Sequence, residues 1–495
     1  MTQNPHSWDL GSLDLDGLQR MAELLSLYLA HGDLVLLEGD LGAGKTTFAR
    51  FLIRALTGNP SEDVPSPTFA LVQSYETPRA TLHHFDLYRL AGPNEIREIG
   101  LDEALTSGLA LVEWPDRAQG LLPANCLRIV LEDSTDPEQR AVTASGMGAF
   151  AERLSHIETV WRFISANGWG QARISPILVD ASRRSYARLT ERGSTCLLMD
   201  SPPLAAGPSV RDGKPYWAIA HSAATVQPFI DIASELDRCG LSVPGILAQS
   251  AAEGLLLVED FGDRTFSMEI SAGRPMHDLY LAATDVLVEL AGHQAPASVP
   301  DYDSRALTIE TSLLIDWYWR HATGTDAPKS VQAEFDDLWR DQVAPLTAAP
   351  RNWVLRDFHS PNLLWLPERQ GIKKVGVIDF QDALAGPAAY DLVSLLQDAR
   401  LDVPETLERD LLEHYMVRRS AHGAGFDRAT FLHTYALMGA QRATKLLGIF
   451  VRLAKRDNKP GYLRFLPRIK RYLARNLAHP GLVDLRAWYE HNLPP

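Results

Sequence analysis

A glycine-rich loop near the N-terminus restricts the fold of this chain more than any other feature. Residues 39–46 read GDLGAGKT and satisfy the pattern G-x-x-x-x-G-K-[ST]. The loop follows an apolar run, Leu34 to Glu38, and precedes a helical pattern, Thr47 to Leu56. A strand, a glycine-rich loop and a helix in this order form a phosphate-binding loop, because glycine lets backbone N–H groups curl around phosphates without Cβ clashes. The sequence therefore predicts an α/β P-loop NTPase domain.

The residues of this loop have separate roles in binding a nucleotide. Gly42 and Gly44 leave room for the phosphates, which the N-terminus of the following helix also attracts. Lys45 is expected to reach the β- and γ-phosphates, and the Thr46 hydroxyl is expected to bind Mg²⁺. With Thr47 they form the predicted cofactor-binding set, and the predicted cofactors are ATP and Mg²⁺.

Two acids end predicted strands and are candidates to complete the metal site. Asp86 follows the strand Thr81–Phe85, and Glu113 ends the strand Leu109–Glu113. Such ends lie beside the phosphate loop when the strands run parallel. Each acid is alternatively a surface residue that ends a strand, and Trp114 either stacks on the base or packs in the core. Two further strands are predicted, at Leu71–Tyr75 and Leu127–Leu131.

Four ordered motifs in this part of the chain resemble the TsaE family of bacterial ATPases. They are Gly39 to Thr46, Ser66-Pro67-Thr68-Phe69, His84-Phe85-Asp86-Leu87-Tyr88-Arg89 and Val112-Glu113-Trp114-Pro115. The resemblance covers nearly all of residues 1–145 and implies a role in forming N6-threonylcarbamoyladenosine (t6A) in tRNA. It also implies that the ATPase docks on a TsaB–TsaD protein pair and contacts tRNA only indirectly.

The same resemblance implies a role for each matching residue. Lys45 and Thr46 hold phosphate and magnesium, and Thr68 lies in a switch-like loop. Asp86 is a catalytic or water-orienting acid. Glu113 is the metal partner that resembles a Walker B acid, and Trp114 contacts the nucleotide.

A second set of acids lies far along the chain. Residues 355–362 read LRDFHSPN and contain the pattern D-x-x-x-x-N, and residues 377–380 read VIDF. Phosphoryl transfer to a hydroxyl group needs an acid that accepts its proton, and an asparagine and a second acid that bind Mg²⁺. Asp357 is therefore the predicted catalytic acid, and Asn362 and Asp379 are the predicted metal ligands. The alternative is a helix-capping aspartate with an unrelated surface asparagine.

These residues resemble the aminoglycoside-phosphotransferase-like kinases, which implies an α+β bilobal, protein-kinase-like domain. A closer resemblance is to the anomeric kinase of N-acetylmuramate and N-acetylglucosamine. Its motifs are Arg356–Leu366, Ile378–Ala383, Ala389–Leu392, Met438–Gln441 and His479–Pro480. The resemblance spans roughly residues 155–495 and implies transfer of the ATP γ-phosphate to the C1 hydroxyl of an amino sugar, in cell-wall recycling.

The segment expected to bind the nucleotide of this kinase departs from the family pattern. Residues 180–186 read DASRRSY and lack G-x-G-x-x-G, and residues 197–200 lack the usual phosphate-binding lysine. Arg183 or Arg184 is a candidate replacement. Glu235 either orients such a group or is a solvated acid. The run Leu255–Glu259 is the predicted adenine hinge, and Glu259 binds the cofactor there through its backbone.

The chain length of 495 residues predicts more than one domain. The strand pattern is lost at residues 146–148, and a helical run, Phe150–Ala166, follows. The predicted domains are therefore residues 1–148 and residues 155–495. The second is expected to contain a strand-rich N-lobe, residues 155–262, and a helical C-lobe, residues 263–495. Its further predicted elements are strands at 177–179, 186–190 and 195–199 and a helix at 229–239.

Charge and cysteine content restrict the partners and the compartment. Residues 1–150 hold 10 Lys/Arg and 21 Asp/Glu, so this part is a poor direct binder of DNA or RNA. The three cysteines include no short-spaced pair, which disfavours a zinc site and a disulfide framework. No apolar run reaches the ~18 residues that span a bilayer, and Met1 to Leu10 do not resemble a secretory signal. A cytoplasmic location without membrane contact is therefore predicted.

Alternative interpretations apply to one basic segment of the chain and to the function of each domain. Residues 441–475 hold eleven Lys/Arg against one acid, which indicates a phosphate or RNA surface or the solvated faces of helices. Apolar residues at helical spacing, such as Leu446 and Phe450, favour the helices. The first domain is alternatively a nucleotide-dependent switch or binding module, and the second domain alternatively phosphorylates another alcohol such as an aminoglycoside.

Overall fold

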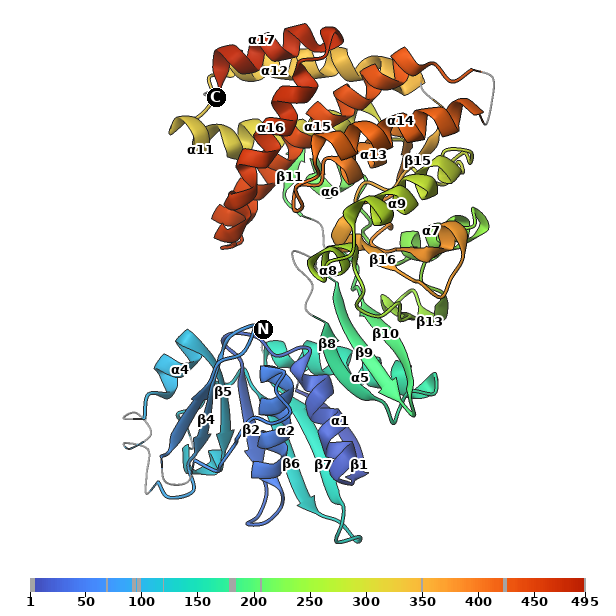
Figure 1. Cartoon of the computed structure of the whole chain (residues 1–495). Coiled ribbons are helices and arrows are strands. Elements are labelled where there is room, and N and C mark those ends of the chain that lie inside the picture. Colours follow the sequence, from blue (N-terminus) through green and yellow to red (C-terminus); the bar gives the residue numbers. More distant parts are fainter. Residues whose placement is uncertain are drawn as a thin grey trace. The chain divides into compact units, whose positions relative to one another are not determined.

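The computed structural model of the chain divides into two compact units. The first comprises Met1–Pro202 and Ile246–Asp260, and the second comprises Pro203–Gly245 and Phe261–Pro495. Figure 1 labels many of the helices and strands of both units. The structure describes residues 5–67, 70–90, 95, 99–118, 120–177, 184–204, 207–348, 350–421 and 425–493.

A mixed seven-stranded sheet organises the N-terminal part of the first unit. Its spatial order is β1-β7-β6-β2-β5-β4-β3. β2 runs parallel to β5 and β6, and β4 runs parallel to β5, whereas the outer pairs are antiparallel. The strands are β1 (His6–Leu13), β2 (Leu34–Glu38), β3 (Val72–Tyr75), β4 (Thr81–Asp86), β5 (Gly108–Glu113), β6 (Leu127–Asp133) and β7 (Arg140–Gly146).

The five strands predicted for this part all form, as β2 to β6, and two strands of the sheet were not predicted. β1 and β7 pair with each other at one side of the sheet. Both are mostly half-buried or exposed and rich in polar and small residues. A strand that faces water on one side and carries few large apolar residues gives only a weak alternating pattern.

Helices and turns cover the two faces of this sheet. α1 (Leu15–Ser26) begins where the Asp14 carboxylate accepts the N–H of Gly17 at 2.7 Å, and it packs against α2 (Lys45–Thr57). Their buried side chains share a core with Val35 and Leu37, on one face of β2. The opposite face of β2 packs in a smaller core with α4 (Leu101–Ser107) and a 3₁₀ turn, η1 (Pro115–Ala118).

A five-stranded antiparallel sheet completes the first unit, in the order β13-β14-β10-β9-β8. The predicted strands 186–190 and 195–199 form within it, and the predicted hinge run 255–259 forms a third strand of this sheet. The predicted strand 177–179 meets β8 only at Ile177, and the remainder lies outside the described residues. The strands are β8 (Arg173–Ile177), β9 (Ser185–Glu191), β10 (Ser194–Asp200), β13 (Ile246–Ser250) and β14 (Leu255–Glu259).

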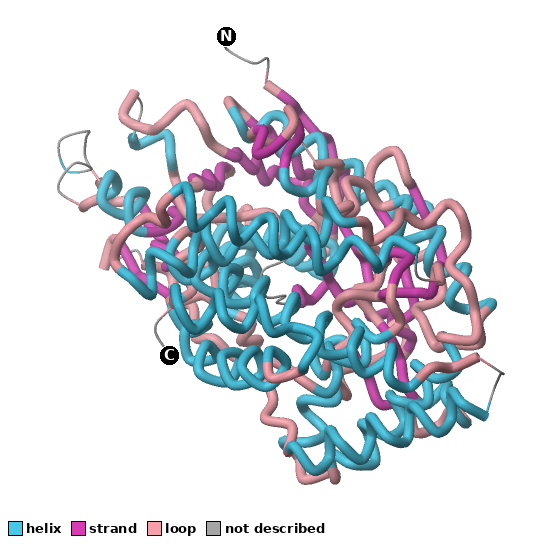
Figure 2. Tube along the Cα trace, turned by 90° about the horizontal axis from the view of Figure 1, so that it is seen from above, coloured by secondary structure: helices cyan, strands magenta, loops and turns pink. Residues whose placement is uncertain are grey.

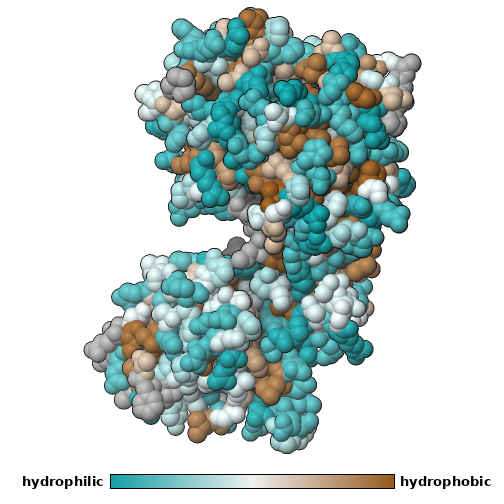
Figure 3. Space-filling view, viewed as in Figure 1, coloured by the Kyte–Doolittle hydropathy of each residue, from teal (hydrophilic) through white to brown (hydrophobic). Residues whose placement is uncertain are grey.

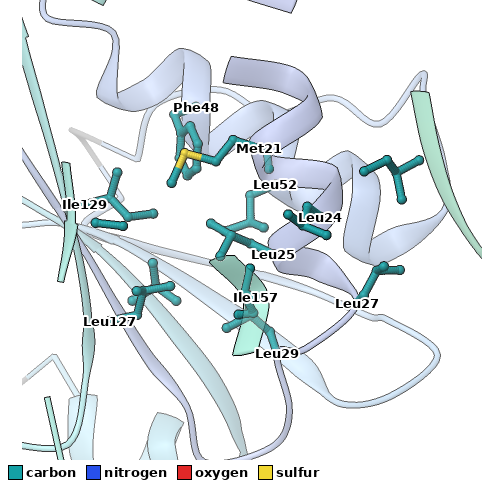
Figure 4. Packing of buried hydrophobic residues seen from close by; sticks show 14 of the residues in the cluster. Met21, Leu24, Leu25, Leu27, Leu29, Phe48, Leu52, Leu127, Ile129 and Ile157 are labelled. Atoms are coloured by element: carbon teal, nitrogen blue, oxygen red, sulfur yellow. The ribbon is translucent and has the colours of Figure 1, made fainter. Parts of the chain in front are cut away.

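One hydrophobic core connects the two sheets of the first unit. Ile174, Leu189, Leu198 and Leu257 of the second sheet belong to the same buried cluster as the apolar faces of α1 and α2. The helix α5 (Ala149–Ala166) links the sheets in sequence and adds side chains to this cluster. Figure 4 shows Ile157 of α5 beside Leu25 and Leu29 of the N-terminal part.

Polar contacts reinforce this shared core at its edge. The Glu23 carboxylate of α1 accepts the Arg173 guanidinium and the N–H of Ile174, the latter at 2.9 Å. The Asp200 carboxylate at the end of β10 accepts the Tyr28 hydroxyl at 2.7 Å and lies 2.7 Å from His156 Nε2. The hydrogen bond to Asp200 raises the pKa of His156.

The second unit is mostly helical, and Figure 2 draws all helices of the chain in cyan. The predicted helix 229–239 forms as α7. The α-helices are α6 (Tyr216–Ile219), α7 (Gln227–Arg238), α8 (Phe266–Ser271), α9 (Met276–Leu290), α10 (Ser304–Leu313), α11 (Trp319–Thr323), α12 (Lys329–Val343), α13 (Ala389–Leu396), α14 (Glu405–Ala421), α15 (Arg428–Lys455), α16 (Leu466–Leu477) and α17 (Val483–Asn492).

Small sheets hold the loops of the second unit. β15 pairs with β18, and β16 pairs with β17, all antiparallel. A third pair, β11 with β12, is also antiparallel. The bounds are β11 (Ser209–Arg211), β12 (Lys214–Pro215), β15 (Asn352–Val354), β16 (Leu363–Trp365), β17 (Val375–Val377) and β18 (Leu384–Gly386).

The basic segment 441–475 belongs to two helices that each bury an apolar face. Leu447 and Phe450 of α15 and Ile469 of α16 are at most 2% exposed, as the helical spacing indicated. On the face shown in Figure 3, apolar residues form small patches in a mostly hydrophilic surface. Among the described residues, no helix is long and apolar enough to cross a membrane.

Candidate active sites

The glycine-rich loop adopts a conformation that requires its glycines. Gly42 and Gly44 have φ of 87° and 101°, in the region that disfavours side chains. A Cβ on Gly39, at φ 141°, would lie 2.3 Å from the carbonyl oxygen of Leu131. The loop leads directly into α2, whose first turn carries Lys45, Thr46 and Thr47. The sequence therefore forms the strand, loop and helix that bind phosphate in such domains.

The Lys45 ammonium lies folded back over this loop. Its Nζ donates to the carbonyl oxygens of Gly39 and Asp40 at 2.8 and 2.9 Å and lies 3.6 Å from the centroid of the Trp114 ring. Burial lowers the pKa of Lys45, and the charges of Glu113 and Asp86 act against this. The ammonium therefore sits among acceptors that a phosphate group can replace.

A hydroxyl and a carboxylate meet beside the loop. Thr46 Oγ1 donates to Glu113 Oε2 at 2.9 Å, and the Glu113 side chain is 2% exposed. Oxygen ligands of these two kinds suit Mg²⁺, which usually takes one or two protein ligands and completes its shell with water and substrate phosphate. The predicted pair Thr46 and Glu113 thus fits the predicted metal.

A buried histidine that sequence reasoning missed holds the other oxygen of this carboxylate. His84 Nε2 lies 3.0 Å from Glu113 Oε1, and the His84 side chain is fully buried. His84 Nδ1 has no hydrogen-bond partner among the described residues. Nε2 therefore donates to Glu113, which fixes the orientation of the carboxylate relative to Thr46. Alternation along β4 places His84 on the same side as Asp86, which was the available signal.

Asp86 lies next to Glu113 as predicted from the parallel strands. The two residues are direct partners in the β4–β5 register. Asp86 accepts the Ser66 hydroxyl at 3.1 Å and the N–H of Tyr88 at 3.0 Å. Trp114 has a positive φ of 59° and packs against Tyr88, with ring centroids 4.9 Å apart. Thr68, predicted in a switch-like loop, lies outside the described residues.

The second unit brings the predicted phosphoryl-transfer residues together. Asn362 Nδ2 donates to the carbonyl oxygen of Asp357 at 3.0 Å and to Asp379 Oδ2 at 3.3 Å. Asp379 also accepts Gln381 Nε2 at 2.8 Å. The β16–β17 hairpin produces this meeting, because Asn362 precedes β16 and Asp379 follows β17. The Asp379 carboxylate and the side-chain amide of Asn362 are groups whose oxygen atoms are suitable ligands for Mg²⁺.

Charge around Asp357 favours its carboxylate form. The surrounding protein acts to raise the pKa of Asp357, but the nearby charges, those of Lys445 and Arg356 among them, outweigh this effect and lower it. The side chain of Asp357 is 45% exposed and so remains open to a substrate. A carboxylate that is ionised and accessible can accept a hydroxyl proton.

A buried aspartate, also missed, supports the backbone of this loop. Asp391 on α13 accepts the N–H groups of Leu355 and Arg356 at 2.6 and 2.9 Å. Arg356 has a positive φ of 70°, which is unfavourable for arginine and needs such support. Burial raises the pKa of Asp391 to about 7, while the two backbone hydrogen bonds act in the opposite direction.

His359 lies in a buried group next to the loop. Its Nε2 lies 3.4 Å from Arg400 Nη1 and 3.9 Å from Asp357 Oδ1. Burial, followed by the charge of Arg400, lowers the pKa of His359 to about 4, so the ring is neutral near pH 7. Asp398 accepts both the hydroxyl and the N–H of Ser360.

The residues predicted to bind the nucleotide of the kinase domain lie on several different elements, and one of them lies outside the described residues. Glu259 ends β14, in the first unit, and pairs with Cys196 in the register. Arg183 lies outside the described residues, whereas Arg184 lies just before β9. Glu235 forms an ion pair with Arg238 one turn along α7, at 2.6 Å, which is the solvated alternative.

Two family models match this chain in separate regions. The first, described as "Threonylcarbamoyl adenosine biosynthesis protein TsaE", matches residues 13–142, and the second, "Phosphotransferase enzyme family", matches residues 173–431. The chain belongs to both families. It joins a TsaE ATPase domain to a phosphotransferase domain, as the motifs indicated, and it is therefore an ATP-dependent enzyme.

Curated relatives divide in the same way. A protein of Caulobacter vibrioides named N-acetylmuramate/N-acetylglucosamine kinase is 37% identical, over 67% of this chain and 95% of its own length. One of the same name from Pseudomonas aeruginosa is 32% identical, over 65% of this chain and 89% of its own length. The tRNA threonylcarbamoyladenosine biosynthesis protein TsaE of Rickettsia bellii is 43% identical, over 23% of this chain and 78% of its own length.

Proposed function

We propose that this chain is a bifunctional ATP-dependent enzyme that serves tRNA modification and cell-wall sugar recycling. The TsaE domain supports t6A formation as an ATPase docked on TsaB and TsaD type proteins. The phosphotransferase domain transfers the ATP γ-phosphate to the anomeric hydroxyl of N-acetylmuramate or N-acetylglucosamine. The convergence of Asp357, Asn362 and Asp379 in the second unit supports the transfer step, and the names of the long relatives support the sugars.

The proposed domains are residues 1–148 and residues 155–495, the latter bilobal with its boundary near residue 262. Both act in the cytoplasm. No direct contact with DNA or a membrane is part of the proposal. The phosphate site of the first domain comprises Gly42, Gly44, Lys45, Thr46 and Thr47.

In the TsaE domain, the chain itself positions the nucleotide and the attacking water. Lys45 exchanges its two carbonyl acceptors for phosphate oxygens. Thr46 and Glu113 would hold Mg²⁺, which neutralises phosphate charge when it is bound. Asp86 orients the water, and Trp114 contacts the nucleotide.

In the phosphotransferase domain, Asp357 takes the proton from the C1 hydroxyl as that oxygen bonds to the γ-phosphorus and the bond to the ADP oxygen breaks. Asn362 and Asp379 would hold Mg²⁺ on the phosphates. Glu259 contributes backbone contacts to the adenine. Asp391 keeps Asp357 in place through the loop backbone.

Two substitutions in the full-length protein test this assignment. Asp357→Asn should lower sugar 1-phosphate formation by about 10²–10⁴-fold, because it removes the base, and should leave ATP hydrolysis with TsaB–TsaD unchanged. Lys45→Ala should do the reverse. Loss of both activities in either variant would contradict separate sites. Wild-type protein that phosphorylates an aminoglycoside but neither sugar would contradict the sugar assignment.

A further inference from the structure

A buried glutamine contacts one of the proposed metal ligands of the kinase domain. Gln381 lies two residues after Asp379 and is 4% exposed. Its Nε2 donates to Asp379 Oδ1 at 2.8 Å, whereas its Oε1 is buried and has no hydrogen-bond partner among the described residues. An ionised carboxylate only accepts hydrogen bonds, so the amide nitrogen faces it and the amide oxygen points away. This orientation satisfies Asp379 and leaves the glutamine with an unpaired acceptor.

The residues on either side of Gln381 hold this segment in place without it. Phe380 is fully buried and stacks on Phe229 of α7, with ring centroids 4.8 Å apart. The Asp382 carboxylate accepts the N–H of Ala223 at 2.6 Å. The segment is therefore fixed at both neighbours, and the buried amide is not needed as its anchor.

A glutamine at this position is unfavourable for the fold alone. Burying an acceptor that forms no hydrogen bond costs free energy, and an apolar side chain of similar shape avoids that cost. Methionine is unbranched, as glutamine is, and has no group that needs a strong hydrogen bond there. Asp379 is half-buried, so water can replace the donor that it would lose. Gln381 therefore serves a purpose other than stability, and its side-chain hydrogen bond goes to Asp379.

Two amide groups fix the Asp379 carboxylate, one on each oxygen. Asn362 Nδ2 donates to Oδ2 at 3.3 Å, and Gln381 donates to Oδ1. Each oxygen has a second lone pair, so a metal ion can bind while both hydrogen bonds remain. Asp379 has a positive φ of 61°, a conformation that costs free energy and that surrounding contacts must maintain. In the TsaE domain, His84 holds one oxygen of Glu113 in a comparable way.

We propose that Gln381 is a positioning residue for the metal site of the kinase domain. Its amide holds the Asp379 carboxylate in the orientation that binds Mg²⁺ together with the nucleotide. The proposal rests on the metal site that is part of the proposed kinase function. Loss of a group that orients a metal ligand typically lowers metal affinity by about 10- to 100-fold. Because Gln381 does not stabilise the fold, this effect is separable from stability.

Hydrogen exchange in the full-length protein measures both properties at this site. With saturating ADP, Mg²⁺ should slow exchange in residues 375–383, which begin with β17. The Mg²⁺ concentration that gives half of this effect should rise about 10- to 100-fold in Gln381→Met. Gln381→Asn, which keeps the amide on a shorter side chain, should fall between the two. Without nucleotide, exchange in β16 and β17 should be no faster in Gln381→Met than in wild type.

The kinase reaction gives a second reading of the same site. The Mg²⁺ concentration for half-maximal sugar phosphorylation should rise in Gln381→Met by the same factor as in hydrogen exchange. The KM for the sugar should stay unchanged, because Gln381 acts on the metal ligand and not on the acceptor.

Gln397→Met is the matched control for the loss of a buried amide. Gln397 is 3% exposed, and its Nε2 donates to Glu408 Oε1 at 3.0 Å, so neither residue belongs to the proposed metal site. This variant should speed exchange in α13 about 10-fold, because a hydrogen bond to a buried carboxylate is lost. It should leave the Mg²⁺ dependence unchanged.

Three outcomes separate this inference from the proposed function. An unchanged Mg²⁺ dependence in Gln381→Met, or faster exchange in β16 and β17 without nucleotide, would overturn the inference and leave the kinase function standing. Wild-type protein in which Mg²⁺ and ADP do not slow exchange in residues 375–383 would overturn the proposed metal site and this inference with it. The expected Mg²⁺ shift in a protein that phosphorylates neither sugar would support the role of Gln381 and contradict the sugar assignment.

Discussion

The shared core of the first unit predicts that the TsaE domain and the five-stranded sheet unfold together. Five leucine and isoleucine side chains of that sheet lie in this core: Ile174, Leu189, Leu198, Leu255 and Leu257. Each such side chain contributes about 1.5–3 kcal/mol when buried, so the five contribute roughly 7–15 kcal/mol as an upper limit. That equals the whole stability of an ordinary domain. Neither part should therefore keep its stability without the other.

Leu198→Ala in the full-length chain tests this at one residue. Leu198 is 1% exposed on β10, and its truncation should destabilise the first unit by about 3–5 kcal/mol. Hydrogen exchange measured by mass spectrometry should then show faster exchange not only in β9 and β10 but also in α1, which packs against β8. The loss of protection in α1 is the decisive reading, because α1 belongs to the TsaE domain.

Leu256→Ala is the matched control for this experiment. Leu256 is also fully buried in the same sheet, but its side chain alternates to the opposite face and is not in the shared core. Leu198→Ala should therefore deprotect α1 more than Leu256→Ala does. Unchanged exchange in α1 with Leu198→Ala, while β9 and β10 lose protection, would refute the shared core as a cooperative unit.

Two further predictions concern the buried groups behind each site. His84→Ala should weaken Mg²⁺-dependent binding of a fluorescent ATP analogue about 10-fold or more, because Glu113 loses its orienting hydrogen bond. His84→Gln should retain most of the binding affinity. Equal binding by both variants and the wild type would contradict this role of His84. The second prediction concerns Asp391, because burial raises its pKa from an ordinary 3.8 to about 7. Between these two pH values, Asp391 keeps its proton in the folded chain and releases it in the unfolded chain. The protonated Asp391 therefore contributes its full stabilisation below about pH 4, and this contribution is lost as the pH rises through about 7. In urea unfolding, the free energy of unfolding of the wild type should fall relative to that of Asp391→Asn between pH 5 and 8. A difference between the two proteins that stays constant over this range would contradict the prediction.

The parts of the structure that the sequence predicts are those encoded by short, contiguous patterns. The glycine loop at residues 39–46 combines a strand, a turn and a helix within a few residues, so its conformation depends little on the rest of the chain. Asp86 and Glu113 are adjacent because parallel strands end at one edge, which follows from strand order alone. The loop 357–362 and Asp379 meet across a single hairpin.

The parts that the sequence did not predict depend on contacts between distant residues. His84 meets Glu113 across 29 positions, and Asp391 meets the backbone of Arg356 across 35. Neither residue type is unusual in a strand or a helix, so its role is visible only in three dimensions.

A shared core and separate chemistry are compatible in one chain. The groups proposed to act on phosphate in the TsaE domain have their contacts within that domain, where Lys45 donates to Gly39 and Thr46 donates to Glu113. The phosphate-binding loop leads into α2, α2 packs against α1, and Glu23 of α1 accepts a hydrogen bond from Arg173 of β8 in the five-stranded sheet. A nucleotide at 100 times its Kd stabilises the domain that binds it by about 2.7 kcal/mol. Because the five-stranded sheet shares a core with the TsaE domain, it should be stabilised with it. The structure therefore favours joint folding of the TsaE domain with the five-stranded sheet.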